Sequence, residues 1–210
     1  MTDSNYSALL LIIDRSGSMA SIRTEMIGSL TTLLRAQAEQ PGLLTVDVVT
    51  FDHQIETTHV LADPRTLDVE LEPRGSTALR DAVGIGVTEF GSRLAAMPEH
   101  ARPGTVLVVV ATDGEENASR HWTPPAIKGL LERQRAEYGW DFMFLGANQD
   151  AITTGTELGF APESAIDFDA DAASIQNVVA SASQYIATSR SGGRGSFTDD
   201  DRRSSSRRRR

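Results

Sequence analysis

Hydroxyl and carboxylate side chains cluster in three short segments of the chain. Asp14-Arg15-Ser16-Gly17-Ser18 and Asp113-Gly114 each follow an apolar run, and Gly75-Ser76-Thr77 precedes a helix-like pattern. Any one of these segments is typical of a helix cap or a turn. Together they contribute three hydroxyls and two carboxylates, from Ser16, Ser18, Thr77, Asp14 and Asp113. This all-oxygen set suits a hard divalent cation.

Mg²⁺ takes about six oxygen ligands at about 2.0–2.1 Å and retains several waters. Ser16 and Ser18 are two residues apart, so one turn can direct both hydroxyls at the same point. Asp14 and Asp113 supply the two negative charges that balance the ion. Five protein groups, some acting through water, leave at least one coordination position open. We therefore predict a magnesium site that accepts a further ligand; Mn²⁺ and Ca²⁺ also favour oxygen ligands.

Strand-like and helix-like patterns alternate along the chain and explain how these segments meet. Strands are predicted at 8–13, 44–51, 54–61, 105–112, 142–147 and 165–168, with a tight hairpin turn at Asp52-His53. Helical spacing of apolar residues predicts helices at 26–38, 79–94, 124–138 and 151–158, and a last one after a cap at Asp169. This order predicts a doubly wound α/β domain over residues 6–189, with a mostly parallel sheet covered on both faces. In such sheets ligands bind beyond the carboxyl ends of the strands.

The sequence Asp14-x-Ser16-x-Ser18, then Thr77, then Thr112-Asp113-Gly114 resembles the metal-ion-dependent adhesion site (MIDAS) of von Willebrand factor A (VWA) domains. The resemblance covers residues 6–189 and includes the third-strand hairpin and the Gly-Ser-Thr-Ala-Leu run before a helix. All five expected positions are filled. A stretch similar to Phe144–Ala151 occurs in stand-alone bacterial and phage members. The resemblance implies a Rossmann-like fold.

The resemblance also implies a role for each residue. Ser16, Ser18 and Thr77 would bind the metal through their hydroxyls, while Asp14 and Asp113 would act mostly through water or hydrogen bonds. A Glu or Asp carboxylate of a partner protein would complete the metal's coordination. The implied function is non-enzymatic, magnesium-dependent binding of a protein, as an adhesion or scaffold module.

Other residues near this rim have two interpretations each. Asn148, Gln149 and Asp150 either cap a helix or contact the partner, and capping is the favoured interpretation. Glu115 and Glu116 are either solvated acids beside the site or additional metal ligands, and solvated acids are the favoured interpretation. Arg15 is expected to point outward, either solvated or paired with a partner.

The charge of the chain is divided between two unlike segments. The formal net charge is −9, yet residues 190–210 hold eight arginines and three aspartates, a net of +5. Residues 1–189 therefore have a net charge of −14, which repels nucleic acid. The segment 190–210 is predicted to be a disordered Arg/Ser/Gly-rich tail. It alone offers an alternative function, association with nucleic acid or an acidic surface.

Composition excludes several classes of protein. The chain has no cysteine, so it has no disulfide, no thiolate metal site and no cysteine nucleophile. No apolar run is long enough for a membrane span, and no secretory signal is visible, so a cytoplasmic location is expected. Asp14 after a buried strand is also found in phosphohydrolases of the haloacid dehalogenase type. Those enzymes need a second acid where this chain has Ser16, so this alternative is the weakest.

Overall fold

A six-stranded sheet forms the centre of the computed structural model, which describes residues 1–147 and 150–206. The strands are β1 (Asp3–Asp14), β2 (Leu43–Phe51), β3 (Ile55–Ala62), β4 (Pro103–Thr112), β5 (Asp141–Ala147) and β6 (Ala165–Phe168). Their order across the sheet is β3-β2-β1-β4-β5-β6, and all pairs are parallel except β2 with β3. The prediction of a doubly wound, mostly parallel sheet with one antiparallel hairpin strand is confirmed. β1 begins five residues earlier than the sequence pattern indicated.

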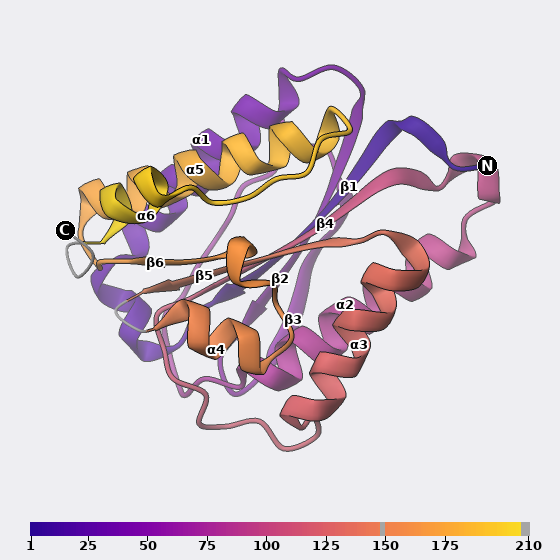
Figure 1. Ribbon diagram of the computed structural model, residues 1–210. Helices are drawn as coiled ribbons and strands as arrows, with labels where there is room; N and C mark the ends of the chain where they lie inside the picture. The colour runs from indigo at the N-terminus through magenta and orange to yellow at the C-terminus, as the bar shows by residue number, and fades with distance from the viewer. Residues whose placement is uncertain (148–149, 207–210) are drawn as a thin grey trace.

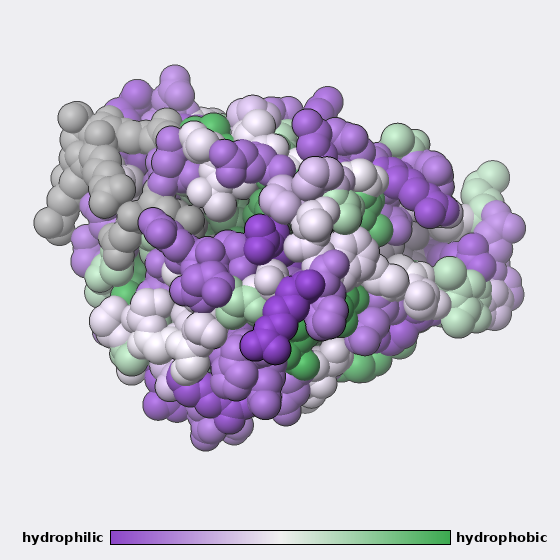
Figure 2. Space-filling model, turned by 90° about the horizontal axis from the view of Figure 1, so that it is seen from below, coloured by the Kyte–Doolittle hydropathy of each residue, from purple (hydrophilic) through white to green (hydrophobic). Residues whose placement is uncertain are grey.

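Helices cover both faces of the sheet (Figure 1). One face carries α1 (Arg23–Ala38), α5 (Ala172–Arg190) and α6 (Asp199–Ser205), and the other carries α2 (Leu79–Ala96), α3 (Pro124–Tyr138) and α4 (Ala151–Glu157). Three short 3₁₀-helices, η1 (Gly17–Ser21), η2 (Glu99–Ala101) and η3 (Pro162–Ser164), complete the described elements. Figure 2, which looks onto the side of the molecule that lies lowest in Figure 1, shows a mostly hydrophilic surface with small scattered hydrophobic patches.

The two central strands are buried on both sides, which is why they are continuous apolar runs in the sequence. Alternate residues of β1 and β4 enter separate cores. Leu9 and Leu107 pack beneath α1 and α5, whereas Leu10 and Val108 pack beneath α2 and α3. The prediction of strands covered on both faces is therefore confirmed for the strands that position the predicted metal site.

Helix caps follow the expected chemistry with one correction. Thr123 caps α3 by accepting a hydrogen bond from the amide of Ala126, with prolines in the first turn. The last long helix, α5, is capped by Asp171, whose carboxylate accepts from the amide of Ser174 at 2.9 Å. The prediction that Asp169 caps it is wrong by two residues, because the Asp169 carboxylate accepts instead from the hydroxyl of Ser206 at 3.2 Å.

The structure corrects the prediction of a disordered tail over residues 191–206. This segment runs back along α5 and forms α6 beside β6 (Figure 1). Phe197 is 6% exposed and its ring lies 5.3 Å from that of Tyr185. Residues 207–210 lie outside the described residues.

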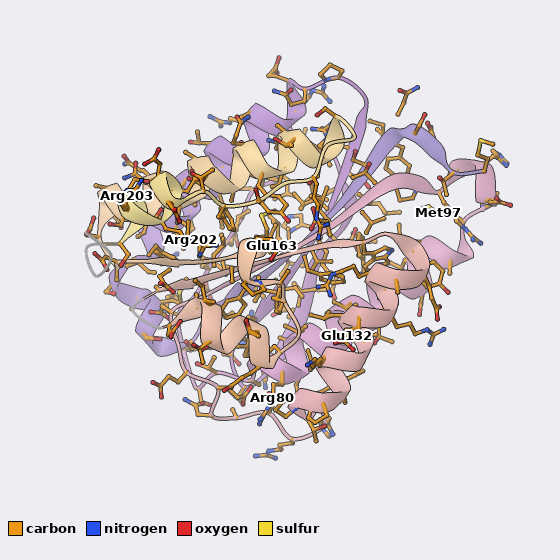
Figure 3. The ribbon with its side chains drawn as sticks, viewed as in Figure 1. Arg80, Met97, Glu132, Glu163, Arg202 and Arg203 are labelled. Atoms are coloured by element: carbon orange, nitrogen blue, oxygen red, sulfur yellow. The ribbon has the colours of Figure 1, made fainter. Side chains whose placement is uncertain are left out.

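Specific contacts explain why this polar segment folds. Gly195 lies against the ring of Tyr185, where a Cβ would come within 2.3 Å of the ring, so only glycine fits. Thr198 and Asp201 form a capping box that starts α6. Arg202, labelled in Figure 3, donates to the carbonyls of Ala165 at 2.6 Å and Pro162 at 2.9 Å. Composition alone conceals these contacts, because Phe197 is the one large apolar residue of the segment.

In the described part of the chain, no helix is both long and apolar enough to pass through a lipid bilayer.

Replacing Phe197 with Ala tests whether the C-terminal segment is packed. Loss of a buried ring is expected to lower the free energy of unfolding, measured by urea denaturation, by about 3–5 kcal/mol. The control is Tyr138→Ala, which removes an aromatic ring that is 60% exposed and should change stability by less than about 0.5 kcal/mol. Equal stability of the two variants would mean that the segment is not packed.

Candidate metal site

The sheet topology brings the two predicted aspartates together. β1 is the strand where the order reverses, with β2 on one side and β4 on the other. Asp14 is the last residue of β1, and Asp113 directly follows β4, whose Ala111 pairs with Ile13. Both carboxylates thus lie at the carboxyl edge of the sheet beside the switch point, where ligands bind in this class of fold.

Hydrogen bonds join the first and third predicted segments. The Ser18 hydroxyl donates to Asp113 Oδ1 at 2.7 Å, and the Ser16 and Ser18 hydroxyl oxygens are 3.1 Å apart. The amide of Ser16 donates to Asp14 Oδ1 at 2.6 Å. Asp14, Ser16 and Thr77 are buried, whereas Ser18 is exposed and Asp113 is half-buried. The site therefore opens to solvent on the side of Ser18 and Asp113.

Gly114 marks the point at which oxygens from all three segments converge. A Cβ added to Gly114 would lie 2.5 Å from Thr77 Oγ1, 3.3 Å from Asp14 Oδ2 and 3.4 Å from Ser16 Oγ. The absence of a side chain at residue 114 leaves this small space clear. The structure thus brings Thr77 next to Asp14 and Ser16, as predicted, around a space lined by oxygen.

Burial changes the acidity of both aspartates. Burial raises the pKa of Asp14, although hydrogen bonds from Thr112 and Ser16 partly offset this effect. Burial likewise raises the pKa of Asp113, and the hydrogen bond from Ser18 opposes it. Among the described residues, no positively charged side chain contributes to either shift. A divalent cation would provide a positive charge.

This oxygen set fits a hard cation such as Mg²⁺. Neutral hydroxyls and two carboxylates are ligands that such ions prefer, and the space beside Gly114 is bounded by three of these oxygens. Among the residues that the structure describes, no three His, Cys, Asp or Glu side chains are grouped so as to hold a metal. Any cation here would therefore depend on Ser and Thr hydroxyls.

Two residues outside the predicted set position its members. Thr112 donates from its hydroxyl to Asp14 Oδ2 at 2.5 Å. The side-chain Oδ1 of Asn117 accepts a hydrogen bond from the backbone amide of Thr77 at 2.9 Å. The backbone amide of Asn117 donates to the Thr77 carbonyl at 3.0 Å. The sequence signal for Thr112 was its place in the Thr-Asp-Gly motif. Asn117 had no such signal, because its contact crosses between two loops.

Arg15 does not point outward as predicted. It is 7% exposed, and its guanidinium donates to Asp52 at 3.2 Å and to Glu56 at 2.7 Å. Asp52 is fully buried at the β2–β3 turn and also accepts from Arg74 at 2.8 Å. Burial by itself would raise the pKa of Asp52, but the bonds from Arg74 and the Gln54 amide and the charge of Arg15 outweigh it and lower the pKa. Arg15 thus fastens the Asp14–Ser18 loop to the neighbouring hairpin.

Glu116 is also not the solvated acid that was predicted. Its carboxylate accepts hydrogen bonds from the amides of Arg80, Ala118 and Ser119, at 2.9, 3.0 and 2.8 Å. These bonds tie the loop after β4 to the first turn of α2, which begins two residues after Thr77. Glu115, by contrast, is exposed as expected.

The rim after β5 is described only in part. Asp150 caps α4 by accepting from the amide of Thr153 at 3.0 Å, which confirms the capping interpretation for this residue. Asn148 and Gln149 lie outside the described residues.

Comparisons with known proteins place the fold. No protein-family model matches the chain, and no curated protein matches it. Solved structures do match. Proximal thread matrix protein 1 from the mussel byssus, with a zinc-occupied MIDAS motif, has a TM-score of 0.62 and 15% identity over 87% of this chain and 46% of that chain.

Two further matches have the same fold. A von Willebrand factor type A structure from Catenulispora acidiphila has a TM-score of 0.59 and 16% identity, over 87% of this chain and 43% of that one. Manganese-loaded TRAP protein of Plasmodium vivax has a TM-score of 0.52 and 17% identity, over 68% and 57%. This chain thus spans less than two thirds of each matched chain. At these identities the likeness establishes a VWA-like fold.

Asp81 generates a prediction about acid stability. This buried carboxylate on α2 accepts from the amides of Arg120, His121 and Trp122 at 2.8, 3.0 and 2.8 Å. Burial would raise the pKa of Asp81, but the three amides outweigh it and lower the pKa. Asp81 therefore stabilises the fold above the ordinary carboxyl pKa of about 3.9, and this contribution is lost as the pH falls through the lowered value.

Asp81→Asn is expected to lower the free energy of unfolding at pH 7 by about 1.5–3 kcal/mol. The difference from wild type should shrink as the pH falls below about 4. Urea titrations between pH 7 and pH 3 measure both quantities. A difference that is constant across this range would show that the Asp81 charge does not stabilise the loop.

Proposed function

We propose that this chain is a non-enzymatic binding module that holds Mg²⁺ and uses the ion to bind a carboxylate of a partner protein. Ser16, Ser18 and Thr77 would hold the ion through their hydroxyls, with Asp14 and Asp113 behind them. The observation that supports this proposal most directly is the convergence of Thr77, Asp14 and Ser16 oxygens beside Gly114. Mn²⁺ or Ca²⁺ would suit the same oxygens.

The electrostatics of the chain favour a partner carboxylate as the added ligand. Hydroxyl ligands are neutral, so an ion held by them keeps most of its positive charge. The body of the protein is strongly acidic, and without the ion it would repel another acidic protein. A bound cation creates a local positive site on this surface and attracts a Glu or Asp side chain.

The contacts of the arginine-rich segment give less support to nucleic-acid binding than its composition alone suggests. Four of its eight arginines make contacts within the chain. Besides Arg202, these are Arg190 on the Gln37 carbonyl at 2.6 Å, Arg194 with Glu163 at 3.5 Å, and Arg203 with Asp200. The other four arginines, at 207–210, lie outside the described residues. Association with nucleic acid or an acidic surface is therefore the weaker proposal. We also propose that the protein is cytoplasmic and resembles stand-alone bacterial or phage modules.

Gly114→Ala tests the metal site directly. Its methyl group would occupy the space between the three oxygens. The affinity for Mn²⁺, used as a spectroscopic substitute for Mg²⁺, should therefore fall at least about tenfold, the order of loss that is typical when the surroundings of a metal site are disturbed. Electron paramagnetic resonance of free Mn²⁺ measures the affinity. The matched control is Gly129→Ala, because a Cβ at this position on α3 meets nothing within 4 Å. Equal affinity of the two variants would place any metal elsewhere.

Capture from cell lysate tests the binding function. Full-length wild type in Mg²⁺ is expected to retain a protein that is lost in EDTA and lost with Ser16→Ala/Asp113→Ala. Amidation of lysate carboxyl groups with carbodiimide and glycinamide should abolish the same capture. Binding through the arginine-rich segment would instead survive EDTA and fall steeply with salt. Identical captures under all conditions would contradict the proposed function.

A further inference from the structure

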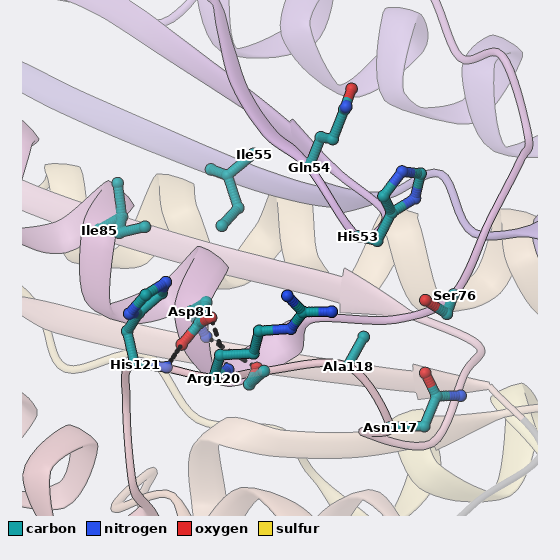
Figure 4. A pocket seen from close by; sticks show the side chains of 11 residues that line it. His53, Gln54, Ile55, Ser76, Asp81, Ile85, Asn117, Ala118, Arg120 and His121 are labelled. Carbon is teal, nitrogen blue, oxygen red and sulfur yellow. Dashed lines mark hydrogen bonds between the residues drawn. The ribbon is translucent and has the colours of Figure 1, made fainter.

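A hollow of about 820 Å³ lies beside the candidate metal site. It is lined by the β2–β3 hairpin with His53, the loop before α2 with Ser76, the first turns of α2, and the loop after β4 with Asn117, Arg120 and His121 (Figure 4). This volume is within the range of about 300–1,000 Å³ that is typical of ligand sites.

The hollow shares a wall with the metal site. Ser76, which lines the hollow, directly precedes Thr77 in the chain. Asn117 also lines it, and this residue holds the amide of Thr77 at 2.9 Å. A peptide whose carboxylate binds an ion at Thr77 would therefore enter the hollow within a few residues of that carboxylate.

The charge of the hollow differs in sign from that of the protein. Arg120 extends across it toward His53 and Ser76 (Figure 4). Within the part of the chain that the structure describes, the guanidinium of Arg120 makes no hydrogen bond or ion pair. Asp81, the one carboxylate in the lining, is buried and accepts hydrogen bonds from three backbone amides. The accessible charged group of the hollow is thus a cation, on a chain whose net charge is −9.

The walls of the hollow are held in place before any ligand binds. Asp81 fixes the backbone of residues 120–122 through its three hydrogen bonds. The His53 ring sits on Gly75, whose φ is +68° and where a Cβ would lie 2.4 Å from His53 Nδ1. His53 also contacts Asp52 at 3.0 Å. A preformed site reduces the entropy that a ligand must lose on binding.

We infer that this hollow binds a second carboxylate of the same partner segment, with Arg120 as its counter-ion. The inference rests on the proposed function, in which a first carboxylate binds the ion. An extended peptide advances about 3.3–3.6 Å per residue, and its alternate side chains point to the same side. The two acids are therefore expected two residues apart, in a Glu-x-Glu pattern.

Two blocked peptides test this inference on the full-length protein. In Ac-Glu-Ala-Glu-Ala-Glu-NH₂ the central Glu can bind the ion, and a further Glu lies two residues away in each chain direction. In Ac-Ala-Ala-Glu-Ala-Ala-NH₂ only the central Glu is present. NMR titrations of ¹⁵N-labelled protein, followed at the amides of Ser76, Arg120 and His121, give each affinity with Mg²⁺ and with EDTA. In Mg²⁺ the triacidic peptide should bind roughly sixfold to fifteenfold more tightly, because its three equivalent acids give a statistical factor of about three and one partly exposed ion pair adds about twofold to fivefold.

Arg120→Ala should reduce this advantage to the statistical factor of about three and leave the affinity for the monoacidic peptide unchanged. The matched control is Arg133→Ala, which removes an equal charge from an exposed arginine paired with Glu137 on α3, and it should keep the advantage.

An advantage of about threefold or less in wild type would overturn the inference while leaving the proposed function intact. An advantage that persists in EDTA would make the hollow an anion site independent of the metal, which also overturns it. Absence of Mg²⁺-dependent binding of the monoacidic peptide would refute the proposed function and, with it, this inference.

Discussion

The burial of Asp14 at the end of β1 constrains the whole carboxyl edge of the sheet. A carboxylate without solvent must be matched by donors or by positive charge, because an uncompensated buried charge is strongly unfavourable. Thr112 and the Ser16 amide supply hydrogen bonds, yet the pKa of Asp14 remains raised by burial. Asp113 lies at the same edge in a similar condition. A cation bound as proposed would supply the positive charge that these two carboxylates need.

The surrounding loops are fastened by other acidic residues. Asp52 holds the first loop through Arg15, Glu116 ties the loop after β4 to α2, and Asp81 fixes the continuation of that loop. Each of these carboxylates accepts several hydrogen bonds from backbone or arginine. Part of the acidity of this chain therefore has a structural function. The acids that face solvent give the body its negative charge, against which the hollow with Arg120 stands out.

The two ends of the sheet differ in how they are protected. β3 is an antiparallel edge strand whose side chains alternate between half-buried and exposed over most of its length. β6 is short, and the segment 191–206 packs beside it through Arg202 and α6. Covering an edge in this way blocks its pairing with another strand. The C-terminal segment is therefore part of the fold, although its composition is that of a linker.

The sequence by itself determined the succession of strands and helices along the chain and the mostly parallel sheet, and it proposed the five site residues. It could do so because buried strands, helical spacing and the short polar motifs are local patterns. Tertiary structure alone decided the rest. The inward position of Arg15, the bond from Asn117 to Thr77, the anchoring by Glu116 and the packing of Phe197 all join residues distant in sequence or on separate loops. Such contacts depend on the relative placement of elements, and local residue patterns do not encode that placement.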